Sequence, residues 1–156
     1  FSMLEENHNQ DFVESVLPCV MSDIYDGYMR LVSLETQSSM DDFERLMVGF
    51  RRVFNITKQI AEDTAVDPAL LVLEEEKRLF ELCATRKDAF HGLMEKRDYD
   101  GALAVLVGFK ETIDNFFDKV FVMDKDEAVK SNRLALLTHL RNMFLTFADF
   151  SKIRFE

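Results

Sequence analysis

Apolar residues recur at intervals of three and four along most of the chain, which is the spacing of one face of an α-helix. The most regular stretch lies between Ala102 and Val120 and predicts one long helix packed against neighbours in a bundle. Its seam consists of Ala102, Leu106, Phe109, Ile113, Phe116 and Val120.

Five further helices are predicted from the same spacing and from residues that typically begin helices. Asp23 is suited to cap a helix, Ser39 with Asp42 resembles a capping box, and Asp67 precedes Pro68 as an N-cap precedes a first helical position. Pro18 weakens the first helix. The predicted ranges are 10–21, 23–34, 39–62, 69–96, 102–120 and a last helix from about 126.

The core faces of these helices can be read from the same pattern. In the helix over 23–34 the residues expected to face inward are Ile24, Tyr28, Leu31 and Val32. In the helix over 39–62 they are Phe43, Leu46, Met47, Phe50, Val53, Phe54 and Ile60. In the helix over 69–96 they are Leu73, Phe80, Cys83, Phe90 and Met94.

The fold class predicted is all-α, an antiparallel helical bundle of about five to six helices. Residues 1–38 form the leading short helices and 39–156 the bundle, expected together as one compact unit and as the carboxy-terminal part of a longer chain. With 47% hydrophobic residues and fifteen Phe, 156 residues can bury a sizeable core. Five Gly and two Pro are too few for the turns of a β-sandwich, and no apolar run is long enough to span a membrane.

The charge is unevenly distributed along the chain. The net charge of −10 opposes non-specific binding to nucleic acids. Residues 45–61 and 128–148 nevertheless contain no acidic residue and together carry +7, which leaves −17 for the remainder. Such a surface can attract a phosphate backbone locally while the rest repels it.

No catalytic or metal-binding residues are predicted. His8, His91 and His139 are scattered, and no glycine-rich loop suited to phosphates is present. Cys19 and Cys83 lie 64 positions apart and are expected to be reduced core thiols.

The acid-free stretches are the remaining candidate site, with two interpretations. They are either solvated helix faces, with Arg133 pairing with Asp118 or Asp149 to lock the last helices, or contacts to RNA. Arginine binds phosphates and stacks on unpaired bases, and asparagine reads base edges. The candidate RNA-binding residues are Arg45, Arg51, Arg52, Asn55, Lys58, Asn132, Arg133 and Arg141.

Three runs near the end of the chain carry a family resemblance. They are Ile-Asp-x-Phe-Phe-Asp-x-Val at 113–120, Asn-Arg-Leu-x-Leu-Leu at 132–137 and Ala-Asp-Phe-Ser-Lys-Ile at 148–153. Arg51–Ile56 and Phe12–Leu17 add weaker matches. In this order and spacing the runs resemble the bacterial glycyl-tRNA synthetase beta subunit, in its carboxy-terminal, DALR-like anticodon-binding domain.

The resemblance implies a function for the chain. It implies recognition of tRNA-Gly in the cytoplasm by part of a glycine–tRNA ligase, in a fragment without catalytic residues or a cofactor of its own. ATP and magnesium would be used at the alpha subunit, the partner in a heterotetramer. Neither DNA nor a membrane is expected as a partner.

The alternative function is a helical protein-interaction or assembly domain with no direct RNA contact. The RNA hypothesis depends on a spatial prediction. The positive sides of the helices over 39–62 and from 126 should join into a single open surface.

Overall fold

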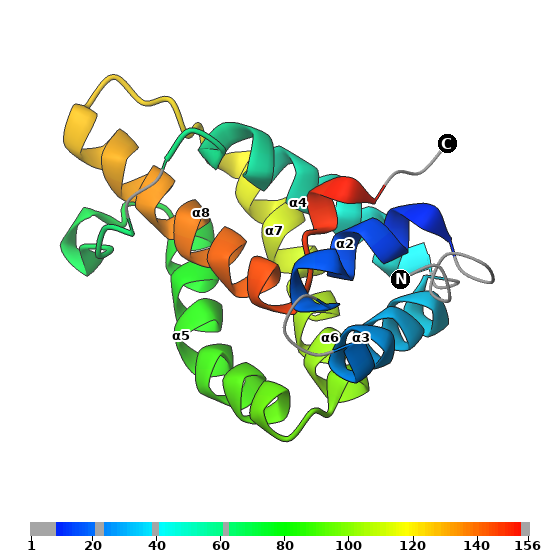
Figure 1. The fold of residues 1–156 in the computed structure, drawn as a ribbon. Helices are drawn as coiled ribbons and strands as arrows, with labels where there is room; N and C mark the ends of the chain where they lie inside the picture. Colours follow the sequence, from blue (N-terminus) through cyan, green and yellow to red (C-terminus); the bar gives the residue numbers. More distant parts are fainter. Residues whose placement is uncertain (1–8, 21–23, 39–40, 61–62, 154–156) are drawn as a thin grey trace.

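The computed structural model describes residues 9–20, 24–38, 41–60 and 63–153, and all regular structure in these ranges is helical (Figure 1). The predicted all-α bundle is therefore confirmed. Among the helices in these ranges, none is long and apolar enough to cross a membrane. The elements in order are α2 (Gln10–Val20), α3 (Ile24–Gln37), α4 (Asp41–Thr57), η1 (Pro68–Leu70), α5 (Glu74–Glu95), α6 (Tyr99–Val107), α7 (Lys110–Lys119), α8 (Glu127–Phe147) and η2 (Phe150–Lys152).

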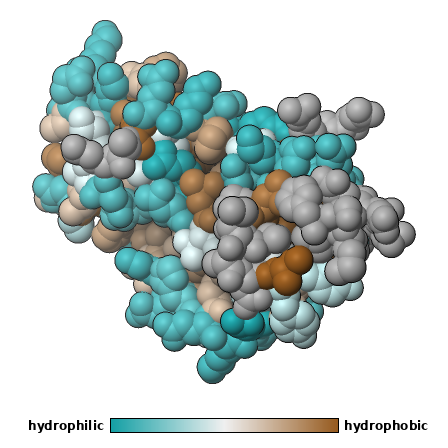
Figure 2. All heavy atoms as spheres, in the orientation of Figure 1, coloured by the Kyte–Doolittle hydropathy of each residue, from teal (hydrophilic) through white to brown (hydrophobic). Residues whose placement is uncertain are grey.

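Helix α8 is the centre of the arrangement. It packs against α4 on one side and α5 on the other, and it also contacts α6 and η1 (Figure 1). Helices α2 and α3 pack on each other, with α3 against α6 and α2 against η2. The face drawn in Figure 2 is largely hydrophilic, with brown atoms gathered near its centre. This is the surface expected when amphipathic helices turn their apolar faces inward.

Phenylalanine rings fill the centre of the bundle. Phe50 of α4 stacks on Phe144 of α8 with ring centroids 5.1 Å apart, and Phe150 of η2 meets both rings at 5.7 Å. Aromatic pairs of this kind contribute about 0.5–1.5 kcal/mol each beyond the burial of their surface. The run that follows α8 therefore helps to close the core between α4 and α8.

The seam predicted over 102–120 is buried at every position, but it belongs to two helices. The N–H of Gly108 donates to Ala104, whereas the N–H of Phe109 donates to Leu106, only three residues back. This tighter turn separates α6 from α7, and glycine is a poor former of helix interiors. Because the apolar residues continue across the turn with the same spacing, the break was not visible in the sequence pattern.

The buried side of helix α3 is rotated around the helix axis relative to the prediction. Ile24, Tyr28 and Val32 are 50%, 44% and 39% exposed, so the prediction that they face inward is wrong, although Leu31 is buried. The polar Asp26 is turned inward instead, because it accepts hydrogen bonds from the Tyr99 hydroxyl and from Arg30 Nε. The buried residues of α3 are Asp26, Gly27, Leu31, Ser33 and Leu34.

The segment before α5 is not helical from residue 69 as predicted. Asp67 does cap a turn that begins at Pro68, accepting from the N–H of Ala69 at 2.9 Å, but this turn is the short 3₁₀ helix η1. The carboxylate of Glu76 then accepts the N–H groups of Val72 and Leu73 at 2.8 Å each, which begins α5 at Glu74.

The end of α4 also differs from the prediction. Helix α4 ends at Thr57 rather than near residue 62. The predicted caps at Asp23 and Ser39 lie outside the described residues.

Candidate nucleic-acid interface

The outward side of α4 is one half of the predicted RNA surface. Its inward side buries Phe43, Phe50 and Val53, and the opposite side of the helix is exposed. The exposed cations and the asparagine on that outward side, together with the lysine that follows the last residue of α4, are here called the α4 basic face: Arg45, Arg51, Arg52, Asn55 and Lys58.

Two arginines of the α4 basic face have partners within the protein. The guanidinium of Arg52 lies over the ring of Phe117 on α7, 4.3 Å from its centroid, and Arg51 donates to the carbonyl of Ile153 at 2.8 Å. Both side chains remain exposed. Arg45, Asn55 and Lys58 are exposed and form no hydrogen bond or ion pair with other described residues. Their charges and amide groups are therefore open to an external ligand.

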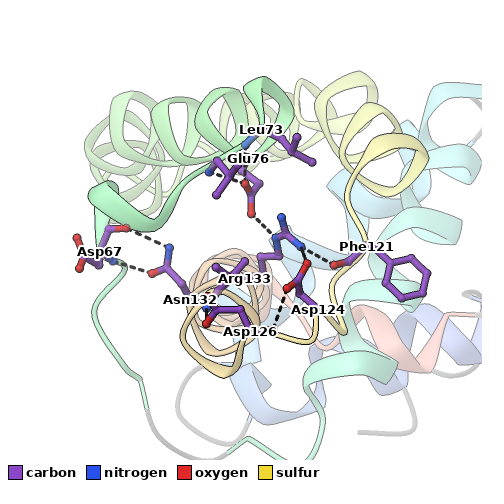
Figure 3. A network of polar contacts seen from close by, with 10 residues as sticks. Asp67, Leu73, Glu76, Phe121, Asp124, Asp126, Asn132 and Arg133 are labelled. Atoms are coloured by element: carbon purple, nitrogen blue, oxygen red, sulfur yellow. Dashed lines mark hydrogen bonds and ion pairs between the residues drawn. The ribbon is translucent and has the colours of Figure 1, made fainter.

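Helix α8 is the other half of the predicted RNA surface. Its first candidate residue, Asn132, is only 5% exposed. It accepts the N–H of Asp67 at 2.7 Å and donates to the carbonyl of the same residue at 3.0 Å (Figure 3). Its amide thus satisfies both backbone groups of one residue and holds the segment before η1 against α8.

Arg133, the next residue, lies in a buried polar network. It pairs with Glu76 of α5, donates to the carbonyl of Phe121 at 2.6 Å and reaches Asp124 at 3.4 Å (Figure 3). The prediction that Arg133 pairs with Asp118 or Asp149 is wrong. The sequence did hold a signal for Glu76, which stands three residues after Leu73 and four before Phe80, in line with the apolar positions of α5.

Arg141 is also buried, at the far end of α4. It donates to the carbonyl of Thr57, the last residue of α4, and, at 3.1 Å, to that of Ile60 just beyond the helix. It thereby holds the end of α4 against α8. Asn132, Arg133 and Arg141 therefore hold the protein together, and they do not extend the α4 basic face. The single open surface predicted across both helices is not formed.

A second feature is a cavity of about 480 Å³ between α5 and α8. His139 projects at its edge, with Nε2 2.7 Å from the carbonyl of Thr64 and 2.9 Å from a carboxylate oxygen of Asp63. Cys83 also lines it, and burial raises the pKa of this thiol to about 12, so it is neutral and unreactive at ordinary pH. The described residues offer no cluster of side chains suited to a metal.

Comparison with known proteins gives the family. The sequence profile of the DALR anticodon binding domain matches residues 46–150. The chain is 36% identical over 148 residues to the glycine–tRNA ligase beta subunit of Sulfurihydrogenibium sp. (strain YO3AOP1), and 37% identical over 154 residues to that of Myxococcus xanthus (strain DK1622). These alignments cover 95% and 97% of the chain and 22% of each relative.

A third relative, the glycine–tRNA ligase beta subunit of Syntrophotalea carbinolica, is 39% identical over 143 residues, which cover 92% of the chain and 21% of the relative. The chain thus spans about a fifth of the length of these curated relatives. The resemblance seen in the sequence motifs is confirmed. The chain belongs to the family of DALR anticodon binding domains.

Proposed function

We propose that this chain recognises the anticodon of tRNA-Gly, as part of the beta subunit of a glycine–tRNA ligase. The observation that carries the proposal is the α4 basic face, an exposed row of cations and one amide in a chain whose family binds anticodons. Because the candidate residues of α8 are buried, α4 provides the surface that meets the RNA.

The chemistry of this face suits an anticodon loop. Guanidinium and ammonium groups bind phosphates, arginine also stacks on unpaired bases, and the amide of Asn55 can read a base edge. The net charge of −10 repels a phosphate backbone from the rest of the molecule. Recognition of this kind needs contacts and no bond-making step, so the chain contributes binding to the enzyme.

The remaining parts of the reaction belong elsewhere in the proposed enzyme. Glycine activation, with its ATP and magnesium, takes place on an alpha subunit, which joins the beta subunit in a heterotetramer. The complex acts in the cytoplasm on tRNA-Gly, and neither DNA nor a membrane takes part. These proposals rest on the family resemblance; the names of the relatives, which are much longer than this chain, say only that they are beta subunits of a glycine–tRNA ligase.

Binding to a fluorescent RNA hairpin that carries the anticodon stem and loop of tRNA-Gly tests the proposal. Arg45→Ala, Arg52→Ala and Lys58→Ala together should weaken binding, by about 1 kcal/mol or more for each specific contact. A matched variant with three exposed cations changed on and after α5, Arg78→Ala, Arg86→Ala and Lys96→Ala, should bind as the wild type does. Equal effects of the two variants, or no binding by the wild type, would overturn the proposal.

The alternative, a protein-interaction domain, is favoured by one observation. Ile24 and Val32 expose apolar surface on α3, where a protein partner could pack. Hydrophobic docking would resist added salt, whereas RNA binding weakens steeply with ionic strength because counterions are released. Titrations of the hairpin at several salt concentrations therefore separate the two functions.

A further inference from the structure

Phe121, in the connection between α7 and α8, is the most exposed large hydrophobic side chain among the described residues, at 76%. Its neighbours Val120 and Val122 are buried, at 6% and 5%. The segment is thus anchored in the core on both sides of an aromatic ring that faces solvent.

The backbone of Phe121 is held in place from inside the protein. Its carbonyl accepts from Arg133, whose side chain is 6% exposed and is itself fixed by Glu76 and Asp124. Figure 3 shows the ring of Phe121 pointing away from this network. A buried ion pair costs desolvation free energy, and here it fixes a connection whose outward residue contacts little of the protein.

Of the three acidic residues nearest to Phe121 along the chain, Asp118 is exposed, whereas Asp124 and Asp126 are engaged within the protein. Asp124 pairs with Arg133 and accepts the N–H of Asp126 at 2.9 Å. Asp126 in turn caps α8, accepting from Ala128 at 3.0 Å. Their negative charge is partly offset by these donors and by the positive end of α8, which leaves the ring as the recognition element of this connection.

Phe121 also follows a helix, α7, that packs beside α4. A methyl group at Gly49 would meet Ile113 of α7, and Arg52 lies over Phe117, one turn further along both helices. Helices α4 and α7 therefore run side by side in the same direction. Their carboxy-terminal ends lie on the same side of the molecule (Figure 1). Asn55 is in the last turn of α4, and Phe121 follows α7 by two residues.

We infer that Phe121 is a stacking platform for an unpaired RNA base, next to the α4 basic face that holds the backbone. The inference rests on the proposed function and adds a contact residue to it. A cationic surface beside an exposed aromatic ring is the combination by which proteins bind single-stranded RNA, because every base has a flat face that can stack. Fixing the backbone that carries the ring lowers the entropy lost on binding.

Substitution of the ring tests the inference. Phe121→Leu keeps apolar bulk and loses the aromatic face, and it should weaken binding of the tRNA-Gly hairpin about tenfold. Phe121→Tyr should bind as the wild type does. Met123→Leu, in the same connection and also exposed, is the matched control and should have no effect. Thermal unfolding should be nearly unchanged in all three, because none of these side chains is buried.

A fluorescence measurement gives a second readout. The chain contains no tryptophan, so Phe121→Trp introduces a single one. Its emission should be quenched when the hairpin binds, and Met123→Trp should respond less. Hairpins with single base changes in the loop then identify the stacked base, because the quenching should be lost only when that base is changed.

The outcomes separate the inference from the function on which it rests. If the wild type binds the hairpin and the α4 triple variant does not, while Phe121→Leu binds normally and Phe121→Trp is not quenched, the stacking role is overturned and the function stands. If Phe121→Leu affects only assembly with another protein, the ring is a protein contact and the inference is again overturned. If the wild type fails to bind, the proposed function fails first.

Discussion

Arg133 of α8 and Glu76 of α5 form an ion pair with both side chains withdrawn from solvent, at 6% and 0% exposure. The same two residues also satisfy backbone groups, the carbonyl of Phe121 and the N–H groups of Val72 and Leu73. One pair thus fixes two long helices, the start of α5 and the connection from α7 to α8.

Removing one member of this pair should be strongly destabilising. Glu76→Leu leaves the buried guanidinium of Arg133 with only the partly exposed Asp124, at 3.4 Å, as its counter-charge, and breaking a buried pair costs up to about 3–5 kcal/mol. Urea denaturation followed by circular dichroism would measure the loss. The double variant Glu76→Leu, Arg133→Met should recover part of it, because no unpaired charge then remains in the core. A double variant as unstable as the single one would show that the backbone contacts dominate.

Asn132→Ala should affect stability and leave RNA binding unchanged. The substitution removes both hydrogen bonds to the backbone of Asp67, at a cost of about 0.5–1.5 kcal/mol each in unfolding free energy. Affinity for the tRNA-Gly hairpin, measured where the variant is fully folded, should equal that of the wild type. A loss of affinity without a loss of stability would instead show that Asn132 contacts the RNA.

Most of the core could be predicted from the sequence, but the candidate polar residues of α8 were expected to be exposed and are buried. The start of α8 could be predicted, because Asp126 precedes the helix and accepts from the N–H groups of Ala128 and Val129. The burial of Arg133 could not, because its partner Glu76 lies 57 positions away and only the packing of α5 on α8 brings them together. Charge counts along the chain do not distinguish a solvated arginine from one that a distant carboxylate neutralises.

Phe121 was overlooked for a related reason. It lies between Val120 and Val122 in an entirely apolar run, where no alternation marks which side chain faces out. The α4 basic face was predictable, because there the cations alternate with apolar residues at helical spacing. Its contact with RNA stays a prediction.

Two glycines in helices should respond in opposite ways to alanine. At Gly92 of α5 an added methyl group meets nothing within 4 Å, so Gly92→Ala should stabilise the protein by about 0.5 kcal/mol through the lower flexibility of the unfolded chain. At Gly49 of α4 the methyl would lie 3.0 Å from Ile113, so Gly49→Ala should destabilise by about 1–3 kcal/mol. Thermal unfolding of both variants, measured side by side, checks the contrast.

Cys83 should make stability fall at high pH. Burial raises the pKa of its thiol from 9.0 to about 12, so between these values the unfolded chain loses this proton while the folded chain retains it. The unfolding free energy should therefore decrease as the pH rises above about 9, and less so in Cys83→Ala. In a Cys19→Ser background, alkylation by iodoacetamide should be slow until urea unfolds the chain. Rapid alkylation of the folded protein would show that the thiol is accessible.

The N–H of Asp149 donates to the carbonyl of Ser15 at 2.7 Å, and this bond joins η2 to α2 across nearly the whole sequence. Closing so long a loop loses more chain entropy than any pairing of neighbouring helices, so folding should reach this contact late. The helices between them can assemble first, and the contact between α2 and η2 then forms last. Pulling on the amino-terminal side should break this bond early, whereas on the other side Phe150 ties η2 to the Phe-rich centre.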